Sequence, residues 1–346
     1  MLESSKASLR VMEAVTQSAK FKKLIGSQEI STKYNSIRDR ICNINYEFFE
    51  QIFIYLFNKY NLELEELNAP TKVDSTYVSL PAKLISWGMF NGKTSKKNPG
   101  VRQLKYSMSL KGSLPSSVEI FTEQSFISED KALSEAITNN IHSDNSIMIV
   151  DRGLTSRDAF VKFSEANLMF IIRSRAVRQF QQDQTVKIGI SQKPKESTVT
   201  IISDKVGKLR NRNNQWTEYN YRIVEAIIDK TGEPIIWITN NLDLDAYQIA
   251  DMYKLRWEIE VFFKFLKQHL NLTHLVSRTE NGMKVMLYST LILAILLIVF
   301  KRKNNIKGYK IAKLKFEIAL DNELIKEIVK LCGGNPNKAQ YLWNSS

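Results

Sequence analysis

Three acidic residues that lie far apart in the sequence, Asp74, Asp151 and Glu260, could bind divalent metal ions together. Carboxylates are the hard oxygen ligands that Mg²⁺ prefers. Two such ions, roughly 3.5 to 4 Å apart, activate a nucleophilic oxygen and stabilise a leaving oxygen. The chemistry that these residues would support is hydrolysis or transfer of a phosphodiester. Taken singly, each acid has a structural alternative: Asp74 near a turn, Asp151 as a helix N-cap and Glu260 as a surface charge.

The third acid lies in the stretch Tyr253 to Lys267, YKLRWEIEVFFKFLK, whose composition predicts one amphipathic helix. At about 100° per residue, four polar residues fall within roughly 60° of one another: Tyr253, Arg256, Glu260 and Lys267. A different arc is apolar and is expected to be buried: Met252, Leu255, Ile259, Phe262, Phe263 and Leu266. We therefore expect the polar face to point away from the core. The alternative is an ordinary solvated helix surface with charges of both signs.

The elements around the other two acids predict a sheet that could bring all three together. Asp74 lies in the strand-like segment Lys72–Leu80, and Asp151 follows a fully apolar segment, SIMIV, of the kind that helices bury on both faces. The end of such a strand is where α/β folds bind ligands. The predicted order is strands 72–80, 101–110 and 118–122, helix 129–141, strand 146–150, helix 156–166 and strand 168–175. This order is that of a ribonuclease-H-like α/β fold, a mixed sheet flanked by helices.

The remaining sequence predicts additions to this sheet. Four strand-like segments before the third acid, TVKIGI, STVTIIS, YNYRIVEAII and EPIIWITN, indicate a β-rich insertion. Periodic apolar residues near the N-terminus indicate a basic helical region that could contact DNA or only cap the next domain. The expected division is a helical region at 1–66, a catalytic core at 67–175 and 236–305, the insertion at 176–235 and a C-terminal helical segment at 306–346.

Composition favours a polyanionic partner. The 346 residues carry 49 Lys and Arg against 36 Asp and Glu, a formal net charge of +13, and nucleic acid is the expected partner of such a chain. The two cysteines, Cys42 and Cys332, show no disulfide or zinc spacing, which fits a reducing cytosol. The longest apolar run, Val285–Phe300, is shorter than the roughly 20 residues of a membrane span, so we expect a buried core helix.

The segments KVDST, MIVDRG and the Tyr-Arg-Glu-Lys spacing at 253, 256, 260 and 267 resemble the motifs of DDE transposases of the fourth insertion-sequence family, the cut-and-paste branch. The resemblance in layout extends from about residue 68 to about residue 300. It implies that Asp74, Asp151 and Glu260 are catalytic and bind two Mg²⁺ ions, with Mn²⁺ as a substitute. It also implies that Tyr253, Arg256 and Lys267 contact transposon-end DNA.

The resemblance further implies partners and a reaction. The partners would be double-stranded DNA, as terminal inverted repeats and target, and a second copy of the chain in the DNA complex, without a membrane. The protein would be bacterial, cytoplasmic and associated with the nucleoid. Because family members turn a base out of the stack during hairpin formation, Trp237 is a candidate stacking platform or else a core residue. Two alternatives remain open: a catalytically silent DNA-binding derivative, and a ribonuclease-H-like nuclease with another substrate.

Overall fold

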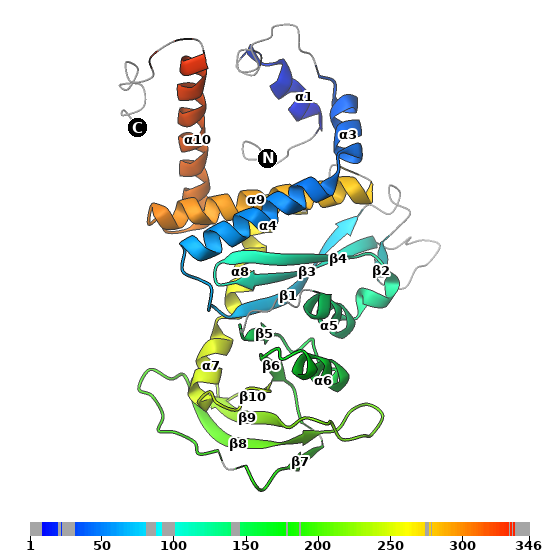
Figure 1. Ribbon diagram of the computed structural model, residues 1–346, viewed down its shortest axis with the longest axis vertical. Helices are drawn as coiled ribbons and strands as arrows, with labels where there is room; N and C mark the ends of the chain where they lie inside the picture. The colour runs from blue at the N-terminus through cyan, green and yellow to red at the C-terminus, as the bar shows by residue number, and fades with distance from the viewer. Residues whose placement is uncertain are drawn as a thin grey trace. The chain divides into compact units, whose positions relative to one another are not determined.

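The computed structural model forms two compact units, which are described separately: residues 1–58 with 264–346, and residues 59–263 (Figure 1). The structure describes residues 9–19, 22, 32–80, 88–91, 101–139, 146–177, 179–186, 188–273, 277, 279–331, 333 and 335. The domain boundaries expected from the sequence remain a prediction.

A ten-stranded mixed sheet forms the centre of the 59–263 unit. Its strand order is β2-β3-β1-β5-β6-β10-β9-β8-β7, and β4 pairs with β3 beside this path. The strands are β1 (Thr71–Leu80), β2 (Met89–Asn91), β3 (Val101–Lys111), β4 (Leu114–Phe121), β5 (Met148–Val150), β6 (Phe170–Ser174), β7 (Phe180–Gln182), β8 (Val199–Leu209), β9 (Tyr221–Ile228) and β10 (Pro234–Thr239).

The first five major strands confirm the predicted fold class. Strands β1, β3 and β4 form the expected antiparallel meander, and β5 and β6 then add in parallel on the other side of β1. All three residues of β5 are buried, as its apolar sequence predicts for a strand covered on both faces. The resulting mixed sheet, flanked by helices, is ribonuclease-H-like.

The insertion strands extend this same sheet. Strand β10 pairs antiparallel with β6, and β9, β8 and β7 follow outward. Of the four predicted strands, STVTIIS, YNYRIVEAII and EPIIWITN correspond to β8, β9 and β10. The segment TVKIGI was wrongly predicted as a strand: its described residues are not paired, and β7 lies just before it at Phe180–Gln182. The alternation of apolar residues in TVKIGI was therefore not enough to make it a strand, because its described residues pair with no neighbouring strand.

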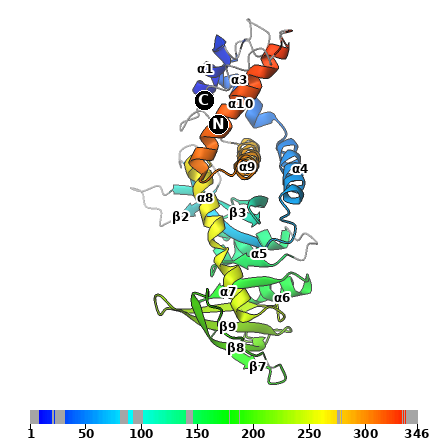
Figure 2. The same cartoon turned by 90° about the vertical axis from the view of Figure 1, so that its left-hand side faces the viewer.

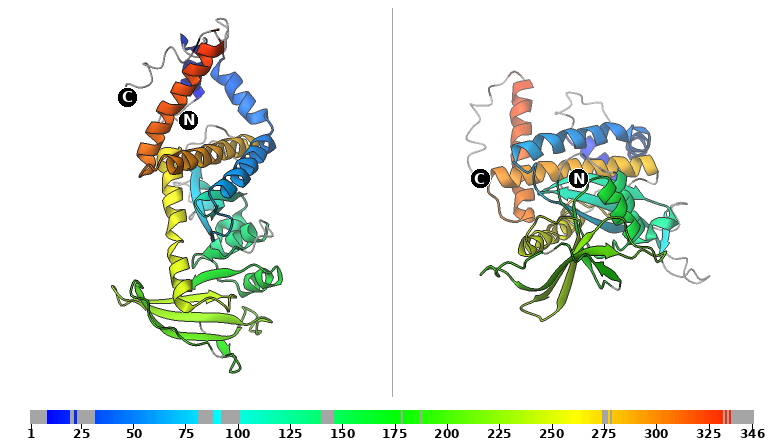
Figure 3. Two further views of the ribbon diagram at one scale, coloured as in Figure 1. Left: turned by 60° about the vertical axis from the view of Figure 1, so that its left-hand side comes forward. Right: turned by 60° about the horizontal axis from the view of Figure 1, so that its bottom comes forward.

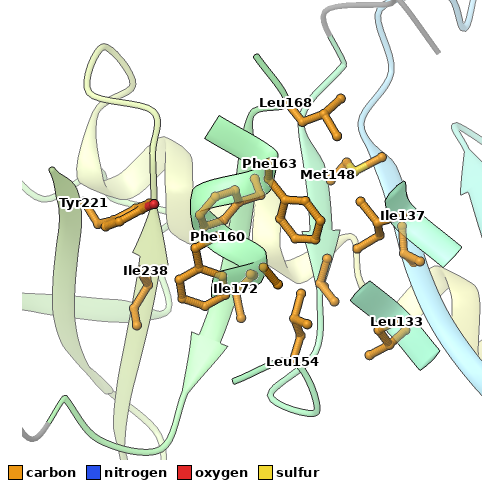
Figure 4. Close-up of a cluster of buried hydrophobic side chains, with 14 of the residues drawn as sticks. Leu133, Ile137, Met148, Leu154, Phe160, Phe163, Leu168, Ile172, Tyr221 and Ile238 are labelled. Atoms are coloured by element: carbon orange, nitrogen blue, oxygen red, sulfur yellow. The ribbon is translucent and has the colours of Figure 1, made fainter. Parts of the chain in front are cut away.

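Helices cover both faces of the sheet. On one face, α5 (Glu129–Asn139) and α6 (Arg157–Glu165) pack over β1, β5 and β6. Figure 4 shows Phe160 and Phe163 of α6 beside Leu133 and Ile137 of α5 in this core. On the other face, α7 (Ala246–Lys254) packs over the sheet through a second core cluster that includes Trp237 and Tyr253. Figure 3 shows α5 and α6 on the side of the sheet opposite α7.

The stretch Tyr253–Lys267 is not one helix, contrary to the prediction. Helix α7 ends at Lys254 and α8 (Trp257–His269) begins after a turn. In this turn the amides of Leu255, Arg256 and Glu258 each donate to the carbonyl three residues earlier, which is 3₁₀-type bonding. The apolar arc within α8 is buried as expected, including Ile259, Phe262, Phe263 and Leu266. Tyr253 therefore lies in a different helix from Glu260, although its ring still lies 5.9 Å from the guanidinium carbon of Arg256.

The other unit is helical. It contains α1 (Leu9–Gln17), α3 (Tyr34–Asn43), most of α4 (Tyr46–Glu63), α9 (Glu280–Lys303) and α10 (Tyr309–Leu331). Helix α9 packs against α3 and α10 (Figure 2). Tyr288 of α9 contacts Tyr46 and Phe53 of α4. Helix α9 has 24 residues and is long and apolar enough to span a membrane, so the length argument made from the sequence fails. Its most apolar 18-residue window is 67% buried in protein, as in a core helix.

Candidate active site

Asp74 and Asp151 lie at adjacent positions on neighbouring strands. Strands β1 and β5 pair in parallel, and the ladder ends at Val73 opposite Val150. Each aspartate directly follows that last pair, on strands that are about 4.8 Å apart in such a sheet. Asp74 lies within β1 and not near a turn. Asp151 is not a helix N-cap, because Ser156 caps α6 by accepting a hydrogen bond from the Ala159 amide.

Arg256 links Asp151 to Glu260. Its Nη1 lies 2.6 Å from Glu260 Oε1, and its Nε lies 3.8 Å from Asp151 Oδ1. The guanidinium is only 16% exposed, and the Asp151 and Glu260 side chains are 30% and 35% exposed. Glu260 is therefore a half-buried, paired carboxylate in the first turn of α8 and not a free surface charge.

Tyr253 contacts the same aspartate from the end of α7. Its hydroxyl donates to Asp151 Oδ1 at 3.3 Å, and its ring lies 6.2 Å from the ring of Trp237. The side chain is buried, contrary to the expectation that it would point away from the core. Burial first, and then the Asp151 carboxylate, raise the pKa of Tyr253 above its usual value. The phenol therefore remains protonated and holds one oxygen of Asp151.

Asp74 has a strongly perturbed pKa. The pKa of Asp74 is raised from 3.8 to about 7, mainly by burial and in addition by the carboxylates of Glu129 and Asp151. The Ser75 amide, which donates to Asp74 Oδ1 at 2.7 Å, and the Arg256 guanidinium act in the opposite direction. The charges of Asp151 and Arg256 therefore both affect the pKa of Asp74. A buried carboxylate next to other carboxylates is typical of a catalytic site.

This pKa predicts a pH-dependent stability. Because the pKa of Asp74 is about 7 in the folded chain and near 3.8 when unfolded, its protonation stabilises the fold fully below pH 3.8. That contribution is lost as the pH rises through 7. Asn at this position cannot ionise. In EDTA, we expect Asp74→Asn to raise the free energy of unfolding at pH 8 by roughly 1 to 4 kcal/mol relative to the parent.

The measurement for this prediction is urea denaturation of both proteins at pH 4 and pH 8. The gain should be present at pH 8 and nearly absent at pH 4. An equal difference at both values would mean that the substitution acts through packing and not through the charge of Asp74.

The sequence predicted roles for two further residues, Lys267 and Trp237. Lys267 lies on α8, seven residues after Glu260, in the part of that helix assigned to the other unit. Its position relative to the acids remains a prediction. Trp237 is 2% exposed and lies in the core, so it cannot stack on a base in this structure.

The structure also reveals residues that the sequence did not single out. Trp257 directly follows Arg256 and is 62% exposed. Glu129, at the start of α5, raises the pKa of Asp74 through its negative charge. Its side chain packs on Gly153, where a Cβ atom would lie 2.6 Å from Glu129 Cδ. Neither had a sequence signal, because an acidic residue in a first helical turn and a Trp beside a buried arc are both ordinary.

The donor chemistry of the three acids fits a hard divalent cation. A cation beside Asp74 would favour its ionised form and offset the burial that raises its pKa. Within the described part of the chain, however, no group of three or more His, Cys, Asp or Glu side chains is close enough to hold one ion. The positive charge next to Asp151 and Glu260 is the Arg256 guanidinium. The acids would therefore have to draw closer to share a metal.

Comparisons with known proteins point to one family. Residues 71–297 match the model of the transposase DDE domain. The chain is 25% identical over 268 residues to the "Probable transposase for insertion sequence element IS5377" of Geobacillus stearothermophilus, covering 76% of this chain and 66% of that protein. It is 24% identical to a Synechocystis protein named for insertion sequence element IS4SA, covering 65% of this chain and 58% of the relative. The chain thus spans between 58% and 66% of the length of these relatives.

Among solved structures, the chain is similar to a piggyBac transposase whose structure is a synaptic complex with hairpin DNA. The TM-score is 0.41 at 10% identity, over 94% of this chain and 69% of that one.

Proposed function

The chain belongs to the transposase DDE domain family, and we propose on that premise that it is a DNA transposase that cuts the ends of its own element and joins them to target DNA. One observation supports the proposal. Within the matched domain, Arg256 contacts both Asp151 and Glu260, and the charges of Asp151 and Arg256 both affect the pKa of Asp74. We further propose the fourth insertion-sequence family, from the spacing of Tyr253, Arg256, Glu260 and Lys267.

In this proposal Asp74, Asp151 and Glu260 hold two Mg²⁺ ions, with Mn²⁺ as a substitute. When bound, such ions activate the attacking oxygen and stabilise the leaving oxygen of the phosphodiester. The protein supplies the remaining functions. Tyr253 donates to Asp151 and orients its carboxylate. Arg256 is positioned to exchange its carboxylate partners for a DNA phosphate, which its planar fork also binds well. Lys267 would add a second contact to the transposon end.

The proposed reaction proceeds by strand cleavage followed by transfer. Water attacks a phosphodiester at the transposon end and releases a 3′ hydroxyl. That hydroxyl attacks a phosphodiester of the opposite strand, which forms a hairpin at the transposon end and releases the flanking DNA with a 3′ hydroxyl. A second water reopens the hairpin. The freed 3′ hydroxyl then attacks a phosphodiester of target DNA, joins to its phosphate and releases a 3′ hydroxyl of the target. Because each of two ends must be held, we propose a homodimer in the DNA complex.

Hairpin formation requires a tight turn of DNA, and an unstacked base would then need an aromatic partner. Trp257, exposed and adjacent to Arg256, replaces Trp237 as our candidate. Stacking is worth about 1 to 3 kcal/mol per base. We therefore expect Trp257→Ala to lower hairpin formation about tenfold and to leave the first nick within about twofold of the parent. Trp257→Phe, which keeps an aromatic face, should retain most hairpin formation in a gel assay of end-labelled DNA. Equal loss of nicking and hairpin formation would contradict this role.

The function is tested with DNA that carries the inverted repeats flanking the native gene. Purified protein should nick and hairpin this DNA in Mg²⁺ and should leave it intact in EDTA. A scrambled repeat of the same length is the matched control. Footprinting of the repeats without cleavage would favour the silent DNA-binding derivative. Equal cleavage of native and scrambled repeats would favour a nuclease with another substrate.

A further inference from the structure

A buried lysine connects the strand of the first acid to the helix of the third. Lys72 lies in β1 and is 1% exposed. Its ammonium donates to the Gly112 carbonyl and lies 2.9 Å from Glu258 Oε2. Glu258 lies in the first turn of α8 and is about half exposed. Neither residue has a role in the catalytic chemistry proposed above.

The two residues lie close to acids on both sides of the contact. Lys72 and Asp74 are two residues apart in a strand, so their side chains share one face of the sheet. Glu258 precedes Glu260 by two residues within the same helical turn. The ion pair between Lys72 and Glu258 therefore connects β1, two residues before Asp74, to the first turn of α8, two residues before Glu260.

The start of α8 needs such a contact. The turn between α7 and α8 has 3₁₀-type bonds, so α7 does not continue into α8 as one rigid rod. Glu260 itself is held by Arg256, which also contacts Asp151. If the Arg256 guanidinium binds a DNA phosphate instead, its contacts with Glu260 and Asp151 are lost. The Lys72–Glu258 ion pair then remains as a polar contact between the first turn of α8 and β1.

The lysine is held in place at its other end. The carbonyl that it contacts belongs to Gly112, in the turn between β3 and β4. Glu66, itself 8% exposed, accepts hydrogen bonds from the amide and hydroxyl of Ser113 in that turn, at 2.9 and 3.0 Å. Gly112 has φ +54 and packs on the Glu66 side chain, where a Cβ atom would lie 2.5 Å from Glu66 Cδ. The ammonium therefore has a fixed backbone partner and a defined position.

We propose that Lys72 and Glu258 are positioning residues: their ion pair holds the first turn of α8 beside β1, so that Glu260 and Asp74 can draw together on divalent metal. This inference rests on the proposed function. Fold stability alone is a weak reason for the pair, because apolar residues of similar volume often stabilise a fold as well as a buried ion pair does. Partners that orient metal-binding side chains typically change metal affinity or activity by about 10- to 100-fold when they are replaced.

The test measures Mn²⁺ binding by the full chain without DNA, from the electron paramagnetic resonance signal of free Mn²⁺. The variant is Glu258→Gln, which is close in size, retains an oxygen acceptor for Lys72 and removes the charge at a half-exposed position. We expect Mn²⁺ affinity to fall about tenfold, with affinity for inverted-repeat DNA unchanged. Glu258→Asp keeps the charge on a shorter side chain, so its Mn²⁺ affinity should lie between those of Glu258→Gln and the parent. The matched control is Asp251→Asn, which breaks an exposed 2.6 Å pair with Lys254 on α7 and should leave Mn²⁺ affinity unchanged.

The outcomes separate this inference from the proposed function. If the parent binds Mn²⁺ at a site that Glu260→Gln removes, but Glu258→Gln binds it as the parent does, the positioning role is refuted and the metal site stands. A lower melting temperature of Glu258→Gln with unchanged Mn²⁺ affinity would likewise assign the pair to stability alone. If the parent shows no Glu260-dependent binding, both the metal site and this inference fail.

Discussion

Glu260→Gln is expected to lower cleavage of transposon-end DNA by at least about 1,000-fold. The substitution removes one negative charge from the proposed metal site, in which three carboxylates would balance the charge of divalent cations. It preserves the size of the side chain and one oxygen, so the 2.6 Å contact with Arg256 can persist as a neutral hydrogen bond. The loss should therefore appear in the chemical step. Affinity for inverted-repeat DNA, measured by mobility shift in EDTA, should stay within about threefold of the parent, or increase slightly because repulsion of phosphate is reduced.

The matched control for this variant is Glu135→Gln, which makes the same chemical change at an exposed position on α5. It should cleave at the parental rate. Cleavage is measured in single turnover with enzyme in excess, so that product release does not hide the chemical step. Cleavage by Glu260→Gln at the parental rate would remove Glu260 from the metal site and would leave the proposed mechanism without its third carboxylate.

The sheet was predictable because its strands have strong local signals. The apolar run before Asp151 predicts a strand buried on both faces, and β5 is such a strand. The positions of Asp74 in β1 and Asp151 after β5 then follow from the order of the elements. The course of the insertion was not predictable, because strand pairing between β10 and β6 depends on which sheet edge is open. Sequence patterns carry no information about that edge.

The helix break after Lys254 shows the limit of periodicity. The residues from 253 to 267 lack Gly and Pro, and nothing in their propensities interrupts a helix. In the structure, Tyr253 packs against the sheet through Trp237, while Arg256 and Glu260 line the site. One straight helix would not satisfy both sets of contacts, so tertiary packing determined the break.

Contacts between distant segments could not be predicted at all. Lys72 and Glu258 are 186 residues apart, and neither shows a periodic partner. The proximity of Glu129 to Asp74 likewise depends on how closely α5 approaches β1. The types and order of the three acids predicted them as candidates. The contacts of Lys72, Glu258 and Glu129 became visible only with coordinates.

Arg222 forms the most deeply buried ion pair of the described residues, and we expect its replacement to be strongly destabilising. It lies in β9 and binds Asp204 of β8 through two parallel contacts, 2.9 Å from Nε and 2.7 Å from Nη2. Both side chains are at most 1% exposed. Nη1 also donates to the Leu242 and Leu244 carbonyls, in the loop that leads into α7. All three guanidinium nitrogens thus donate, and the side chain joins the insertion strands to the loop that leads into α7.

Arg222→Met would leave the Asp204 carboxylate buried without a counter-charge and the loop carbonyls without their donor. We expect a loss of about 3 to 5 kcal/mol in the free energy of unfolding of this region. The double variant Arg222→Met with Asp204→Leu should recover part of that loss, because no unpaired charge remains, although the two carbonyls stay unsatisfied. Lys193→Met is the control, since it breaks a 2.8 Å pair with Asp229 whose side chains are more than a third exposed, and should cost much less than Arg222→Met. Urea denaturation with hydrogen exchange of β8 and β9 measures these changes. A loss for Arg222→Met no larger than that of Lys193→Met would show that water reaches Asp204 and that the pair does not hold the insertion to α7.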